Sequence, residues 1–243
     1  MCSKIRSFGE YSSELLQMRN QSIILLFVRA PVKGKIKSRL GSAIGEDAAL
    51  ELYRNFVLDT IDAIVKSGHP FRIFFHPPDA GEALASWLGP HFHYIPQAGD
   101  DLGENMERAF RKVFTEGFTR AVLLGSDIPD VTPAVLNEAI ESLGTNDVVM
   151  GPAADGGYYL IGCNRGSFLP NVFHGIVWGT STVFRETMGI LHEASLRVHL
   201  VPEWQDVDTK DDLKSLFERN RDTTFDKSRT MAYLMENRDR FLS

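Results

Sequence analysis

Ser22-Ile-Ile-Leu-Leu-Phe-Val28 is followed directly by Arg29-Ala-Pro-Val-Lys-Gly-Lys-Ile-Lys-Ser-Arg39, and this junction decides the fold. The apolar run does not alternate with polar residues, which predicts a strand buried on both faces, as in a parallel sheet. The basic segment begins where that strand ends. Because open α/β sheets bind ligands outside the carboxyl ends of their strands, the basic segment is a candidate binding loop.

Short β-rich runs alternate with longer helical patterns along the chain, which is typical of βαβ units. The expected strands are residues 22–28, 71–75, 92–95, 121–124, 147–150, 158–161 and 196–201. The expected helices are residues 46–66, 80–88, 104–116, 133–143, 180–192, 210–219 and 227–241, with a short one at 11–18. We therefore expect an α/β protein with a Rossmann-like, three-layer αβα architecture and a mixed, mostly parallel sheet.

The composition is that of an ordinary globular chain, with 243 residues and a formal net charge of −6. An acidic chain is a poor candidate for coating nucleic acid or binding a membrane surface. Its longest apolar run, residues 23–28, is far shorter than the roughly 20 residues that span a bilayer. The first 21 residues contain no apolar signal core, and Cys2 and Cys163 form no metal or redox motif. We expect a cytoplasmic protein with no membrane span and no nucleic-acid partner.

The basic segment carries four cations, Lys33, Lys35, Lys37 and Arg39, around Gly34. It matches neither a Walker A loop nor a GxGxxG loop. A flexible loop of this kind can still hold a di- or triphosphate through charge-assisted hydrogen bonds. A solvated surface loop explains the same lysines, and the pattern alone leaves both interpretations open.

Acidic residues follow two other predicted strands. Asp127 lies in Gly125-Ser-Asp-Ile-Pro-Asp130, and Asp206 and Asp208 precede Thr209, the expected cap of a later helix. Carboxylate oxygens are the ligands that a hard divalent cation bridging phosphates requires. A second carboxylate from the later segment could complete a metal site with Asp127. Turn formation and helix capping are the structural alternatives.

The segment Gly151-Pro-Ala-Ala-Asp-Gly-Gly-Tyr-Tyr-Leu-Ile-Gly162 joins two predicted strands. Its paired glycines allow a positive φ and close approach of the backbone to a ligand. Asp155 could orient a hydroxyl or act as a base, and Tyr158 could stack on a ligand. A tight hairpin turn accounts for the same residues. Taken together, the four segments describe a Mg²⁺- or Mn²⁺-dependent site for a nucleoside di- or triphosphate.

These segments resemble the bacterial GT-A-like family called radical-SAM/selenodomain-associated transferase 1, within the nucleotide-diphospho-sugar transferase superfamily. The matching segments are residues 27–40, 97–106, 125–130, 151–162, Trp178 and 206–209, in family order across residues 22–220. The chain departs from the family pattern at Arg29, Lys33 and Ser38, where the family has lysine, proline and threonine. Arg29 keeps the positive charge of the family's lysine, and Ser38 keeps the hydroxyl of its threonine.

The resemblance implies a GT-A fold that binds a nucleotide with its amino-terminal half and an acceptor with its carboxyl-terminal half. The implied metal ligands are Asp127 and Asp208, and the implied catalytic residues are Asp127, Asp155 and Lys37. The implied nucleotide-binding residues are Arg29, Ala30, Pro31, Gly34, Lys37, Arg39, Gln97, Gly99, Gly103, Ser126 and Asp127. The implied acceptor-binding residues are Asp155, Gly156, Gly157, Tyr158 and Trp178.

The same resemblance places a transferase domain at residues 22–220, after an N-terminal extension at 1–21. Residues 221–243 are expected to be a helical tail packed on that domain. The expected activity is metal-dependent transfer from a nucleotide-activated donor, with a glycosyltransferase using a nucleotide sugar as the leading interpretation. One alternative is a nucleotidyltransferase that joins NTP to a phosphorylated small-molecule acceptor and releases pyrophosphate. A non-catalytic nucleotide-binding module is the other alternative, and a homodimer is left open.

Overall fold

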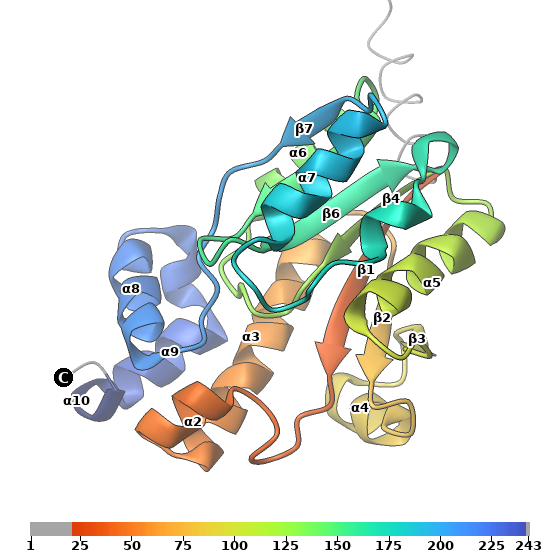
Figure 1. The fold of residues 1–243 in the computed structure, drawn as a ribbon. Helices are drawn as coiled ribbons and strands as arrows, with labels where there is room; N and C mark the ends of the chain where they lie inside the picture. The colour runs from red at the N-terminus through yellow and green to blue at the C-terminus, as the bar shows by residue number, and fades with distance from the viewer. Residues whose placement is uncertain (1–20, 242–243) are drawn as a thin grey trace, which may run out of the picture.

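A seven-stranded sheet lies between helices on both faces in the computed structural model, which describes residues 21–241 (Figure 1). The strands are β1 (Ser22–Arg29), β2 (Phe71–His76), β3 (Tyr94–Pro96), β4 (Arg120–Leu124), β5 (Val148–Pro152), β6 (Tyr158–Asn164) and β7 (Val198–Leu200). Their order is β3-β2-β1-β4-β6-β5-β7. Among these described strands only β6 runs against its neighbours. The expected mixed, mostly parallel sheet is therefore confirmed.

The helices account for two differences from the sequence prediction. They are α2 (Ser38–Ile44), α3 (Glu46–Ser67), α4 (Gly81–Leu88), α5 (Leu102–Thr115), α6 (Pro133–Ser142), α7 (Val183–Glu193), α8 (Lys210–Asn220), α9 (Arg229–Glu236) and α10 (Arg238–Phe241), with 3₁₀ turns η1 (Arg165–Ser167), η2 (Pro170–Phe173) and η3 (Thr224–Lys227). The sequence pattern does not predict helix α2, because the helix is short and its few apolar residues directly follow a run of cations. The single tail helix expected at 227–241 is instead divided, because Ser228 caps α9 and Asn237 ends it. The helix expected at 11–18 lies outside the described residues.

Strand β1 forms the centre of two apolar layers. Ile24, Leu26 and Val28 pack in the cluster that contains α3 and α6. The alternate side chains Ile23, Leu25 and Phe27 pack in the cluster that contains α5 and η2. All six are 9% exposed or less. This two-sided burial is what the uninterrupted apolar run predicts, and it makes the sheet the rigid base of the molecule.

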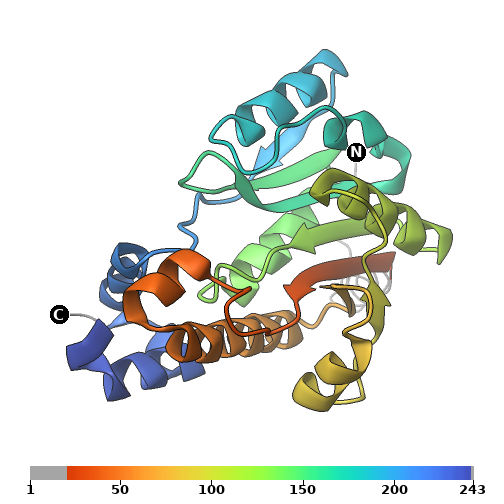
Figure 2. The ribbon, with the colours of Figure 1, turned by 60° about the horizontal axis from the view of Figure 1, so that its bottom comes forward.

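A third apolar cluster joins α2 and α3 to the helices near the carboxyl end, α8, α9 and α10. Figure 2 shows these last helices, in blue, beside the orange α2 and α3. Asp59 of α3 anchors α9: its buried carboxylate accepts hydrogen bonds from the Arg229 and Thr230 backbone N–H groups, at 3.1 and 2.9 Å. The Arg229 guanidinium pairs with Asp59 and with the more exposed Asp62.

Every described strand except β6 ends at the same edge of the sheet, because these strands share one direction. Six loops meet there: residues 30–37 after β1, 77–80 after β2, 97–101 after β3, 125–132 after β4, 153–157 after β5 and 201–209 after β7. This edge is where ligands bind in open α/β sheets. No helix within residues 21–241 has the length and apolar character needed to cross a membrane.

Replacement of Asp59 by alanine should lower the free energy of unfolding by about 2–4 kcal/mol, because two buried N–H groups and a guanidinium lose their acceptor. Urea unfolding followed by circular dichroism measures this change. The matched control is Asp62→Ala, which removes the exposed partner of the same arginine and should cost less than about 1 kcal/mol. Equal losses in the two variants would contradict the anchoring role of Asp59.

Candidate active site

At the edge of the sheet where the parallel strands end, called the carboxyl edge from here on, the Lys37 ammonium group lies between two carboxylates. Lys37 Nζ lies 2.6 Å from Asp127 Oδ1 and 2.7 Å from Asp208 Oδ1. The Lys37 side chain is only 4% exposed, whereas those of Asp127 and Asp208 are 55% and 42% exposed. Burial favours a lower pKa for Lys37, but the charges of Asp127 and Asp208 outweigh it and raise this pKa. The three residues come from the loops after β1, β4 and β7, so tertiary structure brings them together.

The Lys37 backbone adopts the left-handed conformation, with φ 48° and ψ 51°, at the start of α2. A non-glycine residue in this region is uncommon and costs on the order of 1 kcal/mol, and it persists only where the surroundings hold it. Ile36 and Leu40 on either side are buried, at 7% and 0% exposure. These apolar anchors hold the backbone in the conformation that directs the Lys37 side chain to the carboxylates.

Backbone hydrogen bonds hold the Asp127 and Asp208 loops side by side. The Val207 N–H donates to the Asp127 carbonyl oxygen at 3.2 Å. Thr209 caps α8 and forms a capping box with Asp212, as the sequence predicts. The Asp208 N–H also donates to Asp212, at 3.1 Å, so the residue that faces Lys37 sits on an ordered helix start.

Asp130 is a structural centre that the sequence analysis missed. This residue is 3% exposed and accepts hydrogen bonds from four donors. The donors are Trp204 Nε1 at 2.9 Å, Arg219 Nε at 2.8 Å, Arg219 Nη2 at 3.1 Å and Asn220 Nδ2 at 2.8 Å. Asp130 thereby joins the loop after β4 to the loop after β7 and to α8. The only signal in the sequence was a second aspartate in Gly125-Ser-Asp-Ile-Pro-Asp130.

Two further aspartates add negative charge near Lys37. Burial raises the pKa of Asp206 to about 6, helped by the charges of Asp155 and Asp208. Asp155 is exposed, and one of its oxygens accepts the Gly157 N–H at 2.8 Å. Four carboxylates therefore lie at this edge, and three of them, Asp127, Asp206 and Asp208, interact with one buried cation, which makes it a site for cationic or metal-bound ligands.

The carboxylate pair is suited to a divalent cation. Asp127 Oδ1 and Asp208 Oδ1 both reach one nitrogen atom, so one ion placed there would contact both. Within residues 21–241 no three acidic, histidine or cysteine side chains form a complete metal site. Mg²⁺ commonly takes one or two carboxylates and completes its shell with water and substrate phosphate oxygens, which fits this donor set.

The remaining cations of the basic segment lie differently from Lys37. Lys33 pairs with Asp47 at 2.7 Å on the surface. Lys35 and Arg39 are exposed and form no ion pair within the described part of the chain. Gly34 has φ +74°, which lets the segment turn between these side chains. The four predicted cations therefore divide into one buried residue in the carboxylate cluster, one surface pair and two unpaired cations.

Tyr53 of α3 joins the ends of β1 and β4 and was also missed by the sequence analysis. The Arg29 N–H donates to Tyr53 Oη at 2.8 Å, and Ser126 Oγ lies 3.2 Å from the same hydroxyl. Burial and the charge of Asp127 raise the pKa of Tyr53 to about 12. Beside it, Ala30 is buried and its N–H donates to the His76 carbonyl oxygen, and Pro31 is half-buried. The predicted nucleotide-binding residues Arg29, Ala30, Pro31 and Ser126 thus line one ordered corner.

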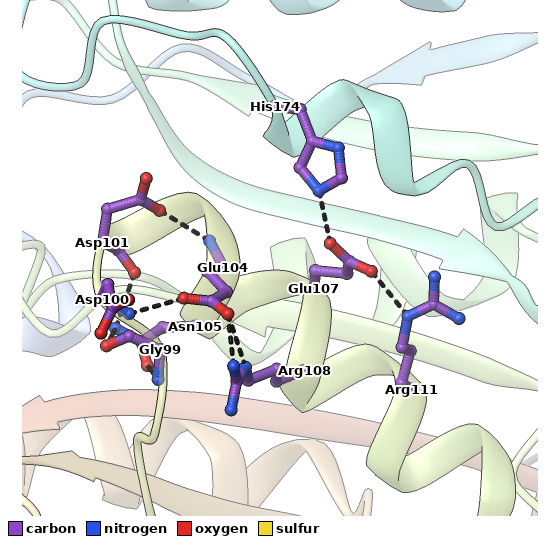
Figure 3. Close-up of polar contacts among 9 residues, drawn as sticks. All are labelled: Gly99, Asp100, Asp101, Glu104, Asn105, Glu107, Arg108, Arg111 and His174. Carbon is purple, nitrogen blue, oxygen red and sulfur yellow. Dashed lines mark hydrogen bonds and ion pairs between the residues drawn. The ribbon is translucent and has the colours of Figure 1, made fainter.

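The predicted nucleotide-binding residues Gln97 and Gly99 lie in the loop after β3, which the start of α5 organises (Figure 3). The Gly99 N–H donates to Asn105 Oδ1 at 2.7 Å, and Asp101 caps α5 by accepting the Glu104 N–H at 2.8 Å. A Cβ at Gly99 would lie 2.8 Å from the Asn105 nitrogen. Gln97 donates its side-chain amide to the Phe74 carbonyl oxygen at 3.1 Å. These interactions fix the shape of the loop.

The predicted acceptor side meets this loop directly. A Cβ at Gly103 would lie 2.2 Å from the Phe173 carbonyl oxygen and 2.9 Å from Trp178 Cζ2. Trp178 contacts Tyr158 edge-on, with ring centroids 6.3 Å apart. The Tyr158 hydroxyl donates to Met106 Sδ at 3.9 Å, and burial raises its pKa. Trp178 therefore lies between the predicted nucleotide and acceptor halves.

The turn that carries Asp155 is held by Gly156. Its φ is +90°, and a Cβ there would lie 2.3 Å from the Ser181 carbonyl oxygen. The Gly156 carbonyl oxygen accepts the Phe184 N–H at 3.0 Å, at the start of α7. Gly156 thus serves close packing between two protein loops.

The family model "Uncharacterized protein conserved in bacteria (DUF2064)" matches residues 60–180. The chain is 42% identical to a candidate nucleotide-diphospho-sugar transferase from Desulfovibrio desulfuricans G20, across 91% of this chain and 97% of that one, with a TM-score of 0.89. It shares its fold with a CMP:2-keto-3-deoxy-manno-octonic acid synthetase complexed with CTP, at 12% identity, 81% and 96% coverage and a TM-score of 0.54. A nucleotidyl transferase from Methanothermobacter has the same fold, at 15% identity, 82% and 97% coverage and a TM-score of 0.54. No curated protein matches the chain in sequence.

Replacement of Asp130 by alanine should lower the free energy of unfolding by about 3–5 kcal/mol, because the Arg219 guanidinium loses its buried partner. Chemical denaturation measures this loss. The exposed Asp222 is the matched control, and Asp222→Ala should change stability by no more than about 0.5 kcal/mol. A loss at Asp130 as small as that of the control would contradict its role as a structural centre.

Proposed function

This chain belongs to one family with the Desulfovibrio protein, and from that premise we propose that it is a transferase using a nucleotide-activated donor. We assign it as a metal-dependent glycosyltransferase acting with a nucleotide-diphospho-sugar. One observation carries the proposal: Asp127, Asp208 and Lys37 converge at the ligand-binding edge of the sheet. This combination provides two oxygen ligands for a divalent ion and one cation for phosphoryl oxygens.

The chain's own groups have distinct roles in the proposed reaction. Asp127 and Asp208 would hold Mg²⁺ or Mn²⁺, which neutralises the charge that develops on the leaving diphosphate. Lys37 and Arg39 would bind the phosphate oxygens, and the corner formed by Arg29 and Ser126 would flank the nucleotide. The donor's bond from the sugar carbon to the diphosphate breaks as the acceptor oxygen attacks that carbon.

Asp155 is proposed as the base that receives the proton of the acceptor hydroxyl. It is exposed at the carboxyl edge, and the Gly157 N–H donates a hydrogen bond to one of its oxygens. Trp178 and Tyr158 would bound the acceptor, with the Trp178 ring against Gly103 closing the gap to the nucleotide.

A thermal-shift panel of nucleotides and nucleotide sugars, each with Mg²⁺, Mn²⁺ or EDTA, should identify the donor. A ligand present at about 100 times its Kd adds roughly 2.7 kcal/mol to the stability, which raises Tm by about 5–10 °C for a chain of this size. We expect one nucleoside class to give this shift with metal and to lose most of it in EDTA. A flat panel would contradict the proposal.

The reaction products then distinguish glycosyl transfer from nucleotidyl transfer. Release of a nucleoside diphosphate from a nucleotide sugar supports glycosyl transfer, whereas pyrophosphate release from NTP with a phosphorylated acceptor would assign nucleotidyl transfer. Binding without turnover of either kind would leave a nucleotide-binding module.

Asp127→Asn should lower kcat by about 10²–10³-fold, the scale of removing one preorganised electrostatic contact. The substitution keeps the shape of the side chain and removes its charge. Steady-state kinetics with the donor found above measures the effect. Asp222→Asn, an exposed substitution away from the edge, is the control, and an equal effect in both variants would contradict the assignment of Asp127.

A further inference from the structure

Lys37 occupies the place that an ion bridging Asp127 and Asp208 would need. Its Nζ lies within 2.7 Å of one oxygen from each carboxylate. The cation is the buried member of the cluster, since its side chain is 4% exposed and the carboxylates are about half exposed. The protein therefore supplies its own cation to a carboxylate pair that opens to solvent.

The ammonium group and a divalent ion cannot both occupy the point between these two oxygens. Mg²⁺ binds carboxylate oxygens at about 2.0–2.1 Å, which places it in the space that Nζ fills. Two cations at such a separation would also repel strongly in a partly buried site. Occupation by one of them requires the other to leave.

We propose that Lys37 is a built-in competitor of the metal ion, which fills the Asp127–Asp208 pair in the free protein and swings away when the ion binds. The swing needs only side-chain rotation, because Ile36 and Leu40 hold the backbone on both sides. Resting on the proposed function, the released ammonium then faces the phosphates of the donor. Metal and donor consequently strengthen each other's binding. The donor phosphate binds the released Lys37 ammonium and keeps it away from the carboxylates, which leaves Asp127 and Asp208 free to bind the ion.

Amine-reactive labelling of the wild-type protein, read by peptide mass spectrometry, tests the swing without any nucleotide. In the absence of metal Lys37 should be protected, because it is buried and ion-paired. Saturating Mg²⁺ or Mn²⁺ should increase its labelling at least five-fold. Lys35, exposed in the same loop, is an internal control whose labelling should not change. Unchanged protection of Lys37 at saturating metal would overturn the proposal, because the ion would then bind beside Lys37.

Titration calorimetry with Mn²⁺ alone provides the second test. Lys37→Met should bind Mn²⁺ about ten-fold or more tightly than the wild-type protein, and Lys35→Met should bind like the wild type. The double variant Asp127→Asn/Asp208→Asn should lose this binding. Equal affinity in Lys37→Met and the wild type, or no binding to Lys37→Met, would overturn the competition.

Circular dichroism checks that Lys37→Met is folded. If it is not, Lys37→Arg keeps the charge and should bind Mn²⁺ no more tightly than the wild type, whereas tighter binding would overturn the proposal. These measurements use the metal ion alone, so they stand apart from the assignment of a donor. If nucleotides shift Tm but Lys37 stays protected from labelling at saturating metal, only the competition is overturned. If no nucleotide shifts Tm but metal increases the labelling of Lys37, only the proposed function is overturned.

Discussion

The ion pairs of Lys37 with Asp127 and Asp208 are the constraint on which the rest of the carboxyl edge depends. Asp127, Asp155, Asp206 and Asp208 come from loops after three strands and would repel one another without a cation among them. The repulsion is visible at Asp206, whose pKa is raised by burial and by its neighbours Asp155 and Asp208. The Lys37 ammonium is buried and pairs with both carboxylates, so these ion pairs constrain the positions of the loops after β1, β4 and β7.

Burial divides two aspartates of one short motif into opposite roles. Asp130 is 3% exposed, and four donors engage its oxygens, which leaves it no capacity for a ligand. Asp127, three residues earlier, has a side chain 55% exposed and meets only Lys37 among the described ion pairs. The first aspartate stabilises the scaffold, and the second can bind something that arrives from solvent. Residue type alone does not distinguish them.

The glycines at this edge have a physical reason in packing, besides the ligand contacts that the sequence suggested. Gly99, Gly103 and Gly156 were interpreted through contacts of the backbone with a ligand. In the structure, a Cβ at Gly99 would come within 2.9 Å of backbone atoms at the start of α5, and a Cβ at Gly103 or Gly156 would come within 2.3 Å of the Phe173 or Ser181 carbonyl oxygen. Their small size lets the loop after β3, the start of α5 and the turn after β5 pack closely against neighbouring backbone. The shape of the edge therefore depends on glycine before any ligand is bound.

The sequence alone determined the layered α/β fold, because an uninterrupted apolar run and the helical periods that follow it are local patterns. It also indicated Asp127, Asp208 and Lys37, since each follows a strand whose end could be read from the pattern. Only the tertiary structure placed a lysine ammonium between the two aspartates, 90 or more positions away along the chain. The roles of Tyr53 and Asp130 likewise came from the fold. Their partners lie on other elements, and distances between elements are set by packing, which no local pattern contains.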